Sequence, residues 1–207
     1  MIISISGFIN SGEDSIAAYL IENYYFEKES WAGSLKDMVA AIFGWDRELL
    51  EGSSRISREW RETIDPWWAE RLGIPHLTPR WVLQHIGTDV LRTHFHDDIW
   101  LYSLENKLQA KEKHVVITDT RFPNELSMVR KQKDSLIIRV KRGNDPDWFS
   151  IATEANNLKS QSAIDELKRL GIHPSEYSWA GYEFDITLDN NGSLEELFAK
   201  VDDIMWQ

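Results

Sequence analysis

A glycine pair near the N-terminus has the spacing of a phosphate-binding loop. Gly7 and Gly12 lie five residues apart, between a β-branched run at 2–6 and a segment of helical periodicity at 14–22. Strand, glycine-bounded loop and helix form the frame of a P-loop, whose pattern is G-x-x-x-x-G-K-S/T. The glycines let backbone N–H groups converge on a phosphate, and the helix N-terminus adds partial positive charge. The residues predicted to bind phosphate are Asn10, Ser11, Gly12, Glu13, Asp14 and Ser15.

Two acidic residues depart from that pattern. Glu13 stands where the pattern has the phosphate-binding lysine, and a carboxylate there repels a polyphosphate and donates no hydrogen bond to it. Asp14 stands where the pattern has a magnesium-binding hydroxyl. The alternative is an ordinary strand–turn–helix, in which both acids only complement the helix dipole. The loop by itself leaves both interpretations open.

Charged side chains also follow other predicted strands. The apolar run 114–119 ends in Asp119, and Arg121 follows where the chain passes into a helix. Open α/β sheets place ligands at the carboxyl ends of their strands, where an arginine can neutralise charge passing between two phosphates. Lys36 lies in the first turn of a predicted helix and is either aimed at this edge or simply solvated. A further cationic group ends the predicted strand 135–140, and it comprises Arg139, Lys141 and Arg142.

A second group of polar side chains lies on a helix that begins at Thr78–Pro79. Threonine is a good helix cap, and proline is favoured in the first turn. Arg80 can hold a phosphate with its planar fork, while Gln84 and Asp89 can hydrogen-bond a base edge or a sugar hydroxyl. The alternatives are surface ion pairs and close helix packing at Gly87. This helix is therefore a second candidate ligand site.

The hydrophobic patterns predict one α/β domain over residues 1–207. The strands are expected at 2–6, 24–31, 114–119, 135–140 and 184–188, with amphipathic helices between them. A stretch rich in tryptophan and arginine, about 46–77, is a predicted helical insertion. The polar stretch at about 142–161 is predicted to be a mobile, lid-like segment.

Composition limits the class of protein. The 207 residues carry a net charge of −11 and no cysteine, which excludes disulfides and favours a reducing cytoplasm. Proteins that grip duplex DNA have a basic field, so polymeric nucleic acid is not an expected partner. No apolar run is long enough to span a bilayer, and the first residues resemble a core strand rather than a signal peptide.

Taken in order, these motifs resemble those of the bacteriophage deoxynucleoside monophosphate kinases, a family of the P-loop kinase class. The resemblance extends from the first predicted strand to the last helix. It implies a three-layer α/β/α sandwich with a five-stranded parallel sheet and helical insertions. It also implies magnesium-dependent transfer of the γ-phosphoryl group of a nucleoside triphosphate, ATP or dATP, to a deoxynucleoside monophosphate. The matching stretches are Gly7–Ser15, Ala32–Lys36, Leu83–Asp89 with Trp100, Asp119–Arg121 with Asn124–Glu125, Arg139–Arg142, His173–Glu176 and Asn191–Leu197.

The resemblance further implies roles for named residues. The expected catalytic residues are Arg121, Asp119 and Lys36, and the expected Mg²⁺ ligands, directly or through water, are Asp14 and Asp119. The glycine loop and the cationic group at 139–142 are expected to bind the phosphate donor. The expected acceptor-binding residues are Lys36, Arg80, Gln84, Asp89 and Trp100. The partners are small nucleotides, a homodimer is left open, and a phage-encoded protein of this kind acts in the host cytoplasm.

The glutamate at the lysine position leaves two functions open. The first is an active kinase in which another cation replaces the lysine, namely Lys36, Arg121 or a residue of 139–142. That cation is then expected within salt-bridge reach of Glu13 when no nucleotide is bound. The second is a catalytically weakened pseudokinase that binds deoxynucleotides to sense or sequester them. The retained polar residues at the strand ends favour the active kinase.

Overall fold

The computed structural model describes residues 1–8 and 10–206, which form two compact units. The first, here called the sheet unit, comprises Met1–Ser30 and the chain from Lys111 onward. The second, here called the helical unit, comprises Trp31–Ala110. Each unit is described by itself below.

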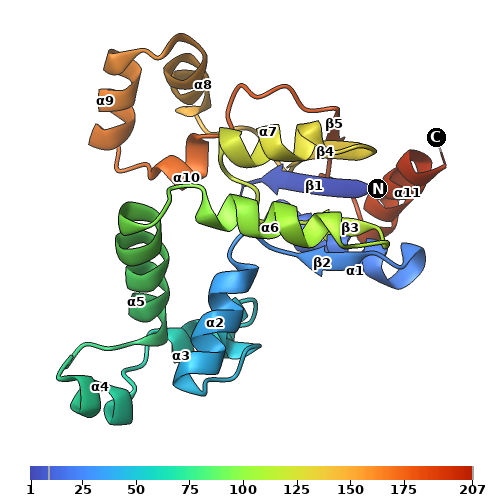
Figure 1. The fold of residues 1–207 in the computed structure, drawn as a ribbon. Coiled ribbons are helices and arrows are strands. Elements are labelled where there is room, and N and C mark those ends of the chain that lie inside the picture. Colours follow the sequence, from blue (N-terminus) through green and yellow to red (C-terminus); the bar gives the residue numbers. More distant parts are fainter. Residues whose placement is uncertain (9, 207) are drawn as a thin grey trace. The chain divides into compact units, whose positions relative to one another are not determined.

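The sheet unit is built on five parallel strands in the order β2-β3-β1-β4-β5 (Figure 1). The predicted parallel sheet is therefore confirmed. Strand order reverses at β1, which pairs with β3 on one side and β4 on the other, and such a switch point is where open α/β sheets bind ligands. The strands are β1 (Ile2–Gly7), β2 (Glu27–Glu29), β3 (Val115–Ile117), β4 (Ser135–Lys141) and β5 (Ile186–Asp189).

Helices cover both faces of the sheet, as the predicted sandwich requires. Helices α1 (Glu13–Tyr24) and α11 (Leu194–Met205) share one core with the sheet, in which Ile3 and Ile5 of β1 are buried. Helix α7 (Pro123–Lys131) packs on β1 and β4 (Figure 1). The other side of β1 carries Ser4, whose hydroxyl bonds that of Thr120 at 2.8 Å.

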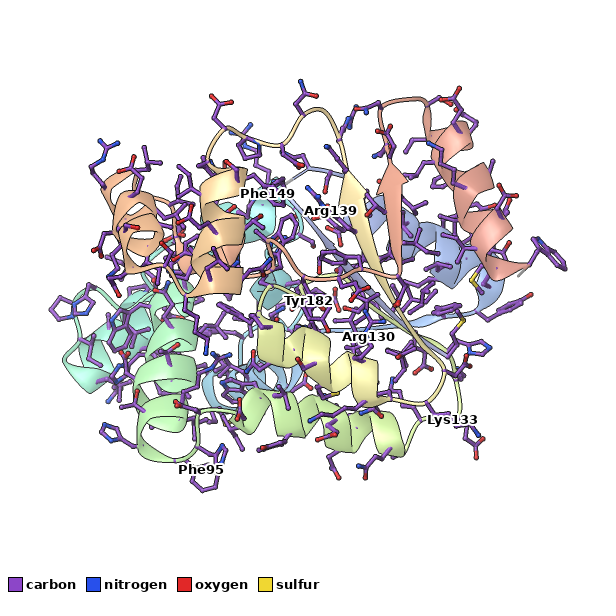
Figure 2. All side chains as sticks on the ribbon, turned by 90° about the horizontal axis from the view of Figure 1, so that it is seen from above. Phe95, Arg130, Lys133, Arg139, Phe149 and Tyr182 are labelled. Carbon is purple, nitrogen blue, oxygen red and sulfur yellow. The ribbon has the colours of Figure 1, made fainter. Side chains whose placement is uncertain are left out.

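The described chain between β4 and β5 forms helices α8 (Phe149–Leu158), α9 (Gln161–Arg169) and α10 (Pro174–Tyr177). They share a small core that includes buried Ala152, Ala155 and Leu167. Helix α8 lies inside the stretch 142–161, for which the sequence predicts a mobile, lid-like segment, and that mobility stays a prediction. Its buried side is mostly alanine, so its sequence has a weak apolar stripe. Figure 2 shows Phe149 of α8 beside Arg139 of β4.

The helical unit contains the predicted insertion. Its core includes Leu35, Val39, Leu50, Leu77, Val82 and Trp100. The sequence predicts helical structure at 57–72 with Pro66 as a candidate break, and the structure has two helices there, because Asp65 caps a new helix that opens with Pro66. The elements are α2 (Gly33–Phe43), the 3₁₀ turn η1 (Leu49–Glu51), α3 (Arg55–Arg61), α4 (Pro66–Leu72), α5 (Pro79–Gln84), the π-helical η2 (His85–Arg92) and α6 (Ile99–Gln109). In the described part of the chain, no helix is long and apolar enough to cross a membrane.

Candidate phosphate-binding site

The glycine loop between β1 and α1 depends on a backbone conformation that glycine adopts readily. Gly12 precedes α1 with φ of 118°, in the left-handed region. A Cβ atom there would lie 2.5 Å from the side-chain nitrogen of Asn190. Asn190 is buried and donates that nitrogen to the carbonyl of Ser11 at 2.7 Å. The turn after β5 thus stabilises the glycine loop through this hydrogen bond.

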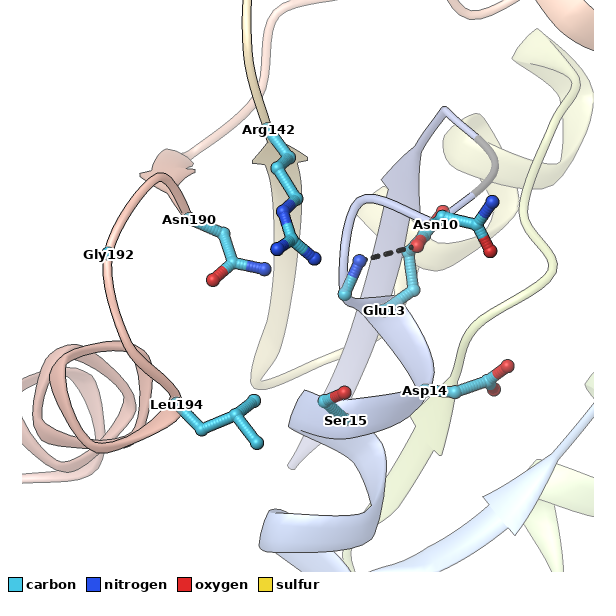
Figure 3. A pocket seen from close by; sticks show the side chains of 9 residues that line it. Asn10, Glu13, Asp14, Ser15, Arg142, Asn190, Gly192 and Leu194 are labelled. Atoms are coloured by element: carbon cyan, nitrogen blue, oxygen red, sulfur yellow. Dashed lines mark hydrogen bonds between the residues drawn. The ribbon is translucent and has the colours of Figure 1, made fainter.

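A cavity of about 510 Å³ opens at the N-terminus of α1 in the sheet unit (Figure 3). A volume of this size is typical of small-ligand sites. The cavity brings together the glycine loop, the end of β4 and the turn from β5 to α11. Its lining residues are Asn10, Gly12, Glu13, Asp14, Ser15, Arg142, Asn190, Gly192 and Leu194. All six predicted loop residues except Ser11 line it, and Ser11 is buried beneath them.

Glu13 turns its carboxylate back into the loop. The residue is only 7% exposed, and its Oε2 accepts the backbone N–H of Gly12 at 3.0 Å, the dashed line in Figure 3. Within residues 1–8 and 10–206, the buried Oε1 accepts no hydrogen bond. Nη2 of Arg121 lies 3.7 Å from Oε1. The carboxylate is therefore compensated by one backbone donor and one guanidinium.

Arg121 joins the end of β1 to the start of α7. Its Nη1 donates to the carbonyl of Gly7, and its backbone N–H donates to the buried carboxylate of Glu125 at 2.7 Å. Among the cations proposed to replace the loop lysine, Arg121 has the ion pair with Glu13, whereas Lys36 belongs to the helical unit. The guanidinium is thus positioned by the backbone carbonyl at the end of β1 and by the Glu13 carboxylate.

Asp14 faces away from Glu13 and forms its own contacts. Its exposed carboxylate accepts Nζ of Lys28 at 2.8 Å and the hydroxyl of Thr118 at 3.3 Å. Burial raises the pKa of Asp14, but Lys28, Thr118 and the charge of Arg121 outweigh it, so the pKa lies below its ordinary value. Asp119 follows Thr118 at the end of β3 and is half-buried.

The residues at the cavity can be compared with those that the magnesium ion implied by the resemblance would require. Among the described residues, no group of three His, Cys, Asp or Glu side chains could hold a metal ion. Mg²⁺ is commonly bound by one or two carboxylates together with substrate phosphates and waters. The ionised carboxylate of Asp14 lines the cavity and meets the first of these requirements.

The predicted cationic group at the end of β4 divides into two parts. Arg142 lines the cavity. The Arg139 guanidinium instead lies 4.6 Å from the ring centre of Phe149 and 5.2 Å from that of Trp179, and it pairs with Asp145. Lys141 also pairs with Asp145, at 3.2 Å. Of the described cationic side chains in this group, only Arg142 faces the cavity.

The five predicted acceptor-binding residues all lie in the helical unit. Lys36 donates to Glu51 at 2.6 Å, and Arg80 pairs with Glu62. Burial raises the pKa of Glu51, but the hydrogen bonds and charges of Lys36 and Arg47 hold it below its ordinary value. Both candidate phosphate-binding cations therefore have carboxylate partners in this state.

The other three predicted acceptor residues differ in exposure. Gln84 is exposed. Oδ2 of Asp89 lies 3.0 Å from Nδ1 of His85, at hydrogen-bond distance. Trp100 is buried and donates its indole N–H to the carbonyl of Gly87 at 3.0 Å. A Cβ at Gly87 would meet Leu35 at 2.6 Å, so close packing, one alternative considered for this glycine, is present.

Three residues that line the cavity are not among the predicted site residues: Asn190, Gly192 and Leu194. The turn at 189–192 was recognisable, and its place directly after the last strand was an available signal. Parallel strands end at one edge of the sheet, so a turn after β5 belongs near the loop after β1.

Comparison with known proteins identifies viral relatives. No family model matches the chain. It is 28% identical, over 97% of its length and 94% of the relative's, to a putative deoxynucleotide monophosphate kinase of Acanthamoeba polyphaga mimivirus. It is 22% identical, over 97% and 96%, to the deoxynucleotide monophosphate kinase of Enterobacteria phage T4. A stretch of 69 residues is 41% identical to the deoxynucleoside-5'-monophosphate kinase of Escherichia phage T5, covering 31% of this chain and 28% of that one. The resemblance predicted from the motifs is confirmed.

Solved structures also align with most of the chain at low sequence identity. TT1252 from Thermus thermophilus aligns with a TM-score of 0.48 and 16% identity, over 99% of this chain and 96% of that one. Shikimate kinase from Aquifex aeolicus aligns with a TM-score of 0.43 and 15% identity, over 99% and 96%. The APS kinase CysC of Mycobacterium tuberculosis aligns with a TM-score of 0.43 and 16% identity, over 100% and 97%.

Proposed function

We propose that this homologue of viral deoxynucleotide monophosphate kinases transfers the γ-phosphoryl group of a nucleoside triphosphate to a deoxynucleoside monophosphate, with a P-loop that has no lysine. The observation that carries the proposal is the cavity of about 510 Å³ at the N-terminus of α1. Its glycine loop, its cation Arg142 and its position at the strand-order switch suit a polyphosphate. The full-length similarity to proteins of that name supports the substrate class.

The donor triphosphate is assigned to this cavity. The N–H groups at the start of α1 and the Arg142 guanidinium would hold its phosphates, and Asp14 and Asp119 would orient the magnesium–water shell. When bound, Mg²⁺ supplies further neutralisation of the β- and γ-phosphate oxygens. ATP or dATP is the expected donor.

Arg121 is assigned to the charge that develops during transfer. Phosphoryl transfer needs positioning and electrostatic stabilisation far more than covalent help from the protein. Arg121 is anchored at the end of β1 through the Gly7 carbonyl, so its guanidinium is held beside the loop. Lys36, Arg80, Gln84, Asp89 and Trp100 of the helical unit remain the predicted acceptor residues, with Lys36 also a predicted catalytic residue. A homodimer and action in the host cytoplasm remain predictions.

A nucleotide-binding pseudokinase is the second candidate. The observation in its favour is the buried Glu13 carboxylate at the lysine position. Losing a charge-assisted phosphate contact costs about 1.5–3 kcal/mol, and a repelling carboxylate adds to that cost. Such a protein would bind deoxynucleotides and turn them over poorly.

A coupled phosphotransfer assay separates the two candidates. Each of the four deoxynucleoside monophosphates is combined with ATP or dATP, in Mg²⁺ or Mn²⁺, with a control that lacks the acceptor. The kinase proposal predicts a diphosphate product from one acceptor or more. Nucleotide binding by calorimetry without product formation under any of these conditions would favour the pseudokinase.

A further inference from the structure

The Glu13 carboxylate lies where the glycine loop would receive an anion. Its Oε2 takes the N–H of Gly12, one of the donors that a loop of this kind offers to phosphate. Its Oε1 lies 3.1 Å from the position of a Cβ added to Gly7, so the carboxylate packs directly against the loop backbone. The Glu13 side chain thus occupies the anion position of the glycine loop.

Electrostatics allow only one anion in this space. A phosphate oxygen near the Gly12 N–H would lie within a few ångströms of a buried carboxylate, where like charges repel strongly. The Glu13 carboxylate is also incompletely satisfied. In the part of the chain that the structure describes, Oε1 accepts no hydrogen bond, and the hydroxyl of Ser11 is buried without a partner beside Gly7. A buried carboxylate with one hydrogen bond and one guanidinium at 3.7 Å is weakly held.

We propose that the Glu13 carboxylate is the resident anion of this loop, and that the polyphosphate of a nucleoside triphosphate binds by displacing it. This inference rests on the proposed function, because it assigns the donor to the same cavity. Displacement returns the Gly12 N–H to the incoming phosphate and removes the carboxylate from Arg121. The guanidinium then exchanges one anionic partner for another, and it takes the place of the missing lysine.

Glu13 therefore weakens donor binding even though it makes no contact with the bound donor. The cost of expelling the carboxylate is subtracted from the binding energy of every polyphosphate, so donor binding is weaker than the loop geometry would otherwise allow. A neutral side chain of the same shape removes this cost. Glu13→Gln keeps an oxygen that accepts the Gly12 N–H and has no negative charge.

The test is calorimetric titration of the folded full chain with inorganic pyrophosphate in EDTA, and with ATP in Mg²⁺. We expect Glu13→Gln to bind pyrophosphate about tenfold more tightly, or more, because a buried like charge is gone. Glu22→Gln is the matched control. Glu22 is exposed on the same helix, and its substitution changes the net charge by the same amount as Glu13→Gln. The pyrophosphate affinity of Glu22→Gln should therefore equal that of the wild type. Glu13→Ala, checked by thermal unfolding with the others, is the second variant and should also bind more tightly.

Three results would overturn the inference. The first is equal pyrophosphate affinity in Glu13→Gln, Glu22→Gln and the wild type. The second is no pyrophosphate binding by the wild type or either Glu13 variant. The third is loss of Mg·ATP binding in Glu13→Gln, which would make Glu13 a metal ligand. Failure of the proposed function has a different signature. Tighter pyrophosphate binding by Glu13→Gln, without any phosphotransfer by the wild type, would support the displacement inference and contradict the kinase proposal.

Discussion

The Arg121 guanidinium lies beside the Glu13 carboxylate and donates to the Gly7 carbonyl, so a single side chain contacts both ends of the glycine loop. A cation in this position meets charge that grows as the phosphoryl group moves, and it then stabilises the transition state more than the ground state. Under the proposed function, Arg121 is therefore expected to contribute to turnover as well as to binding.

Arg121→Ala is expected to lower kcat at least as much as it raises KM for the donor. The physical reason is that the interaction lost is stronger in the transition state than in the bound substrate. Steady-state kinetics with saturating acceptor separate the two constants. Arg121→Lys keeps the positive charge and removes the planar guanidinium, so it shows how much of the effect is due to charge alone. Unchanged kcat with a raised KM would make Arg121 a binding residue only.

Glu13→Lys is expected to change turnover modestly or abolish it. A lysine at this position would face Arg121, whose Nη2 lies 3.7 Å from Oε1 of Glu13 and already supplies a cation there. Two cations would then compete for one phosphate site. A hundredfold gain in kcat, about 2.7 kcal/mol of transition-state stabilisation, would instead show a damaged ordinary P-loop. Steady-state assays of wild type and variant decide between these outcomes.

At the scale of elements, the glycine loop is held by segments that are distant in the sequence. Asn190 lies 179 residues from Ser11, whose carbonyl it bonds. Phe8 follows β1, and its ring packs 4.8 Å from that of Trp179 and 5.5 Å from that of Trp148. The loop is therefore supported by the turn after β5 and by the aromatic cluster near α8 and α10.

Asn190→Ala is expected to destabilise the fold by about 1–3 kcal/mol, because it leaves the buried Ser11 carbonyl without its donor. Donor affinity should fall as well, because the loop loses its support. Urea denaturation and nucleotide titration measure the two effects. Asn106→Ala, at an exposed position of α6, is the control and should change neither quantity. Wild-type stability in Asn190→Ala would show that this bond does not support the loop.

Phe8→Ala is expected to cost about 2 kcal/mol of stability, because a half-buried ring leaves an aromatic cluster. Phe8→Leu should lose less stability than Phe8→Ala, because leucine keeps part of the apolar contact. Thermal unfolding followed by circular dichroism measures the loss of stability in each variant. Phe95→Ala removes a ring that is 71% exposed and serves as the control. If both alanine variants unfold alike, the cluster does not stabilise the loop.

The elements differ in how well the sequence predicted them, for physical reasons. The apolar runs of β1, β3 and β4 are buried on both faces, so composition alone identifies them. The expected second strand at 24–31 is only Glu27–Glu29, since α1 continues to Tyr24 and Tyr25 ends it with φ of 58°. Helix α8 was missed because Ala152 and Ala155 form its buried side. Asn190 was missed because its contact with the loop joins opposite ends of the chain.

At the scale of the molecule, the cations stand out against a net charge of −11. The overall field repels nucleotides, so local cations must hold them. Arg142 lines the cavity at the N-terminus of α1, whereas Lys36 and Arg80 belong to the helical unit. If the proposed assignment is right, each unit carries the cations for one of the two substrates, and variants of one unit should leave the other substrate's affinity intact.

Arg80→Ala and Lys36→Ala are each expected to weaken deoxynucleoside monophosphate binding by about tenfold or more, since a charge-assisted phosphate contact is worth about 1.5–3 kcal/mol. Both cations are paired with carboxylates, Glu62 and Glu51, and these pairs must open for a phosphate to bind. Calorimetric titration with the monophosphate measures the loss, and titration with ATP should give the wild-type affinity. Arg55→Ala is the control, because that side chain is 86% exposed on the same unit. Unchanged monophosphate affinity in both variants would remove the helical unit from the acceptor site, whereas a parallel loss of ATP affinity would contradict the division of substrates between the units.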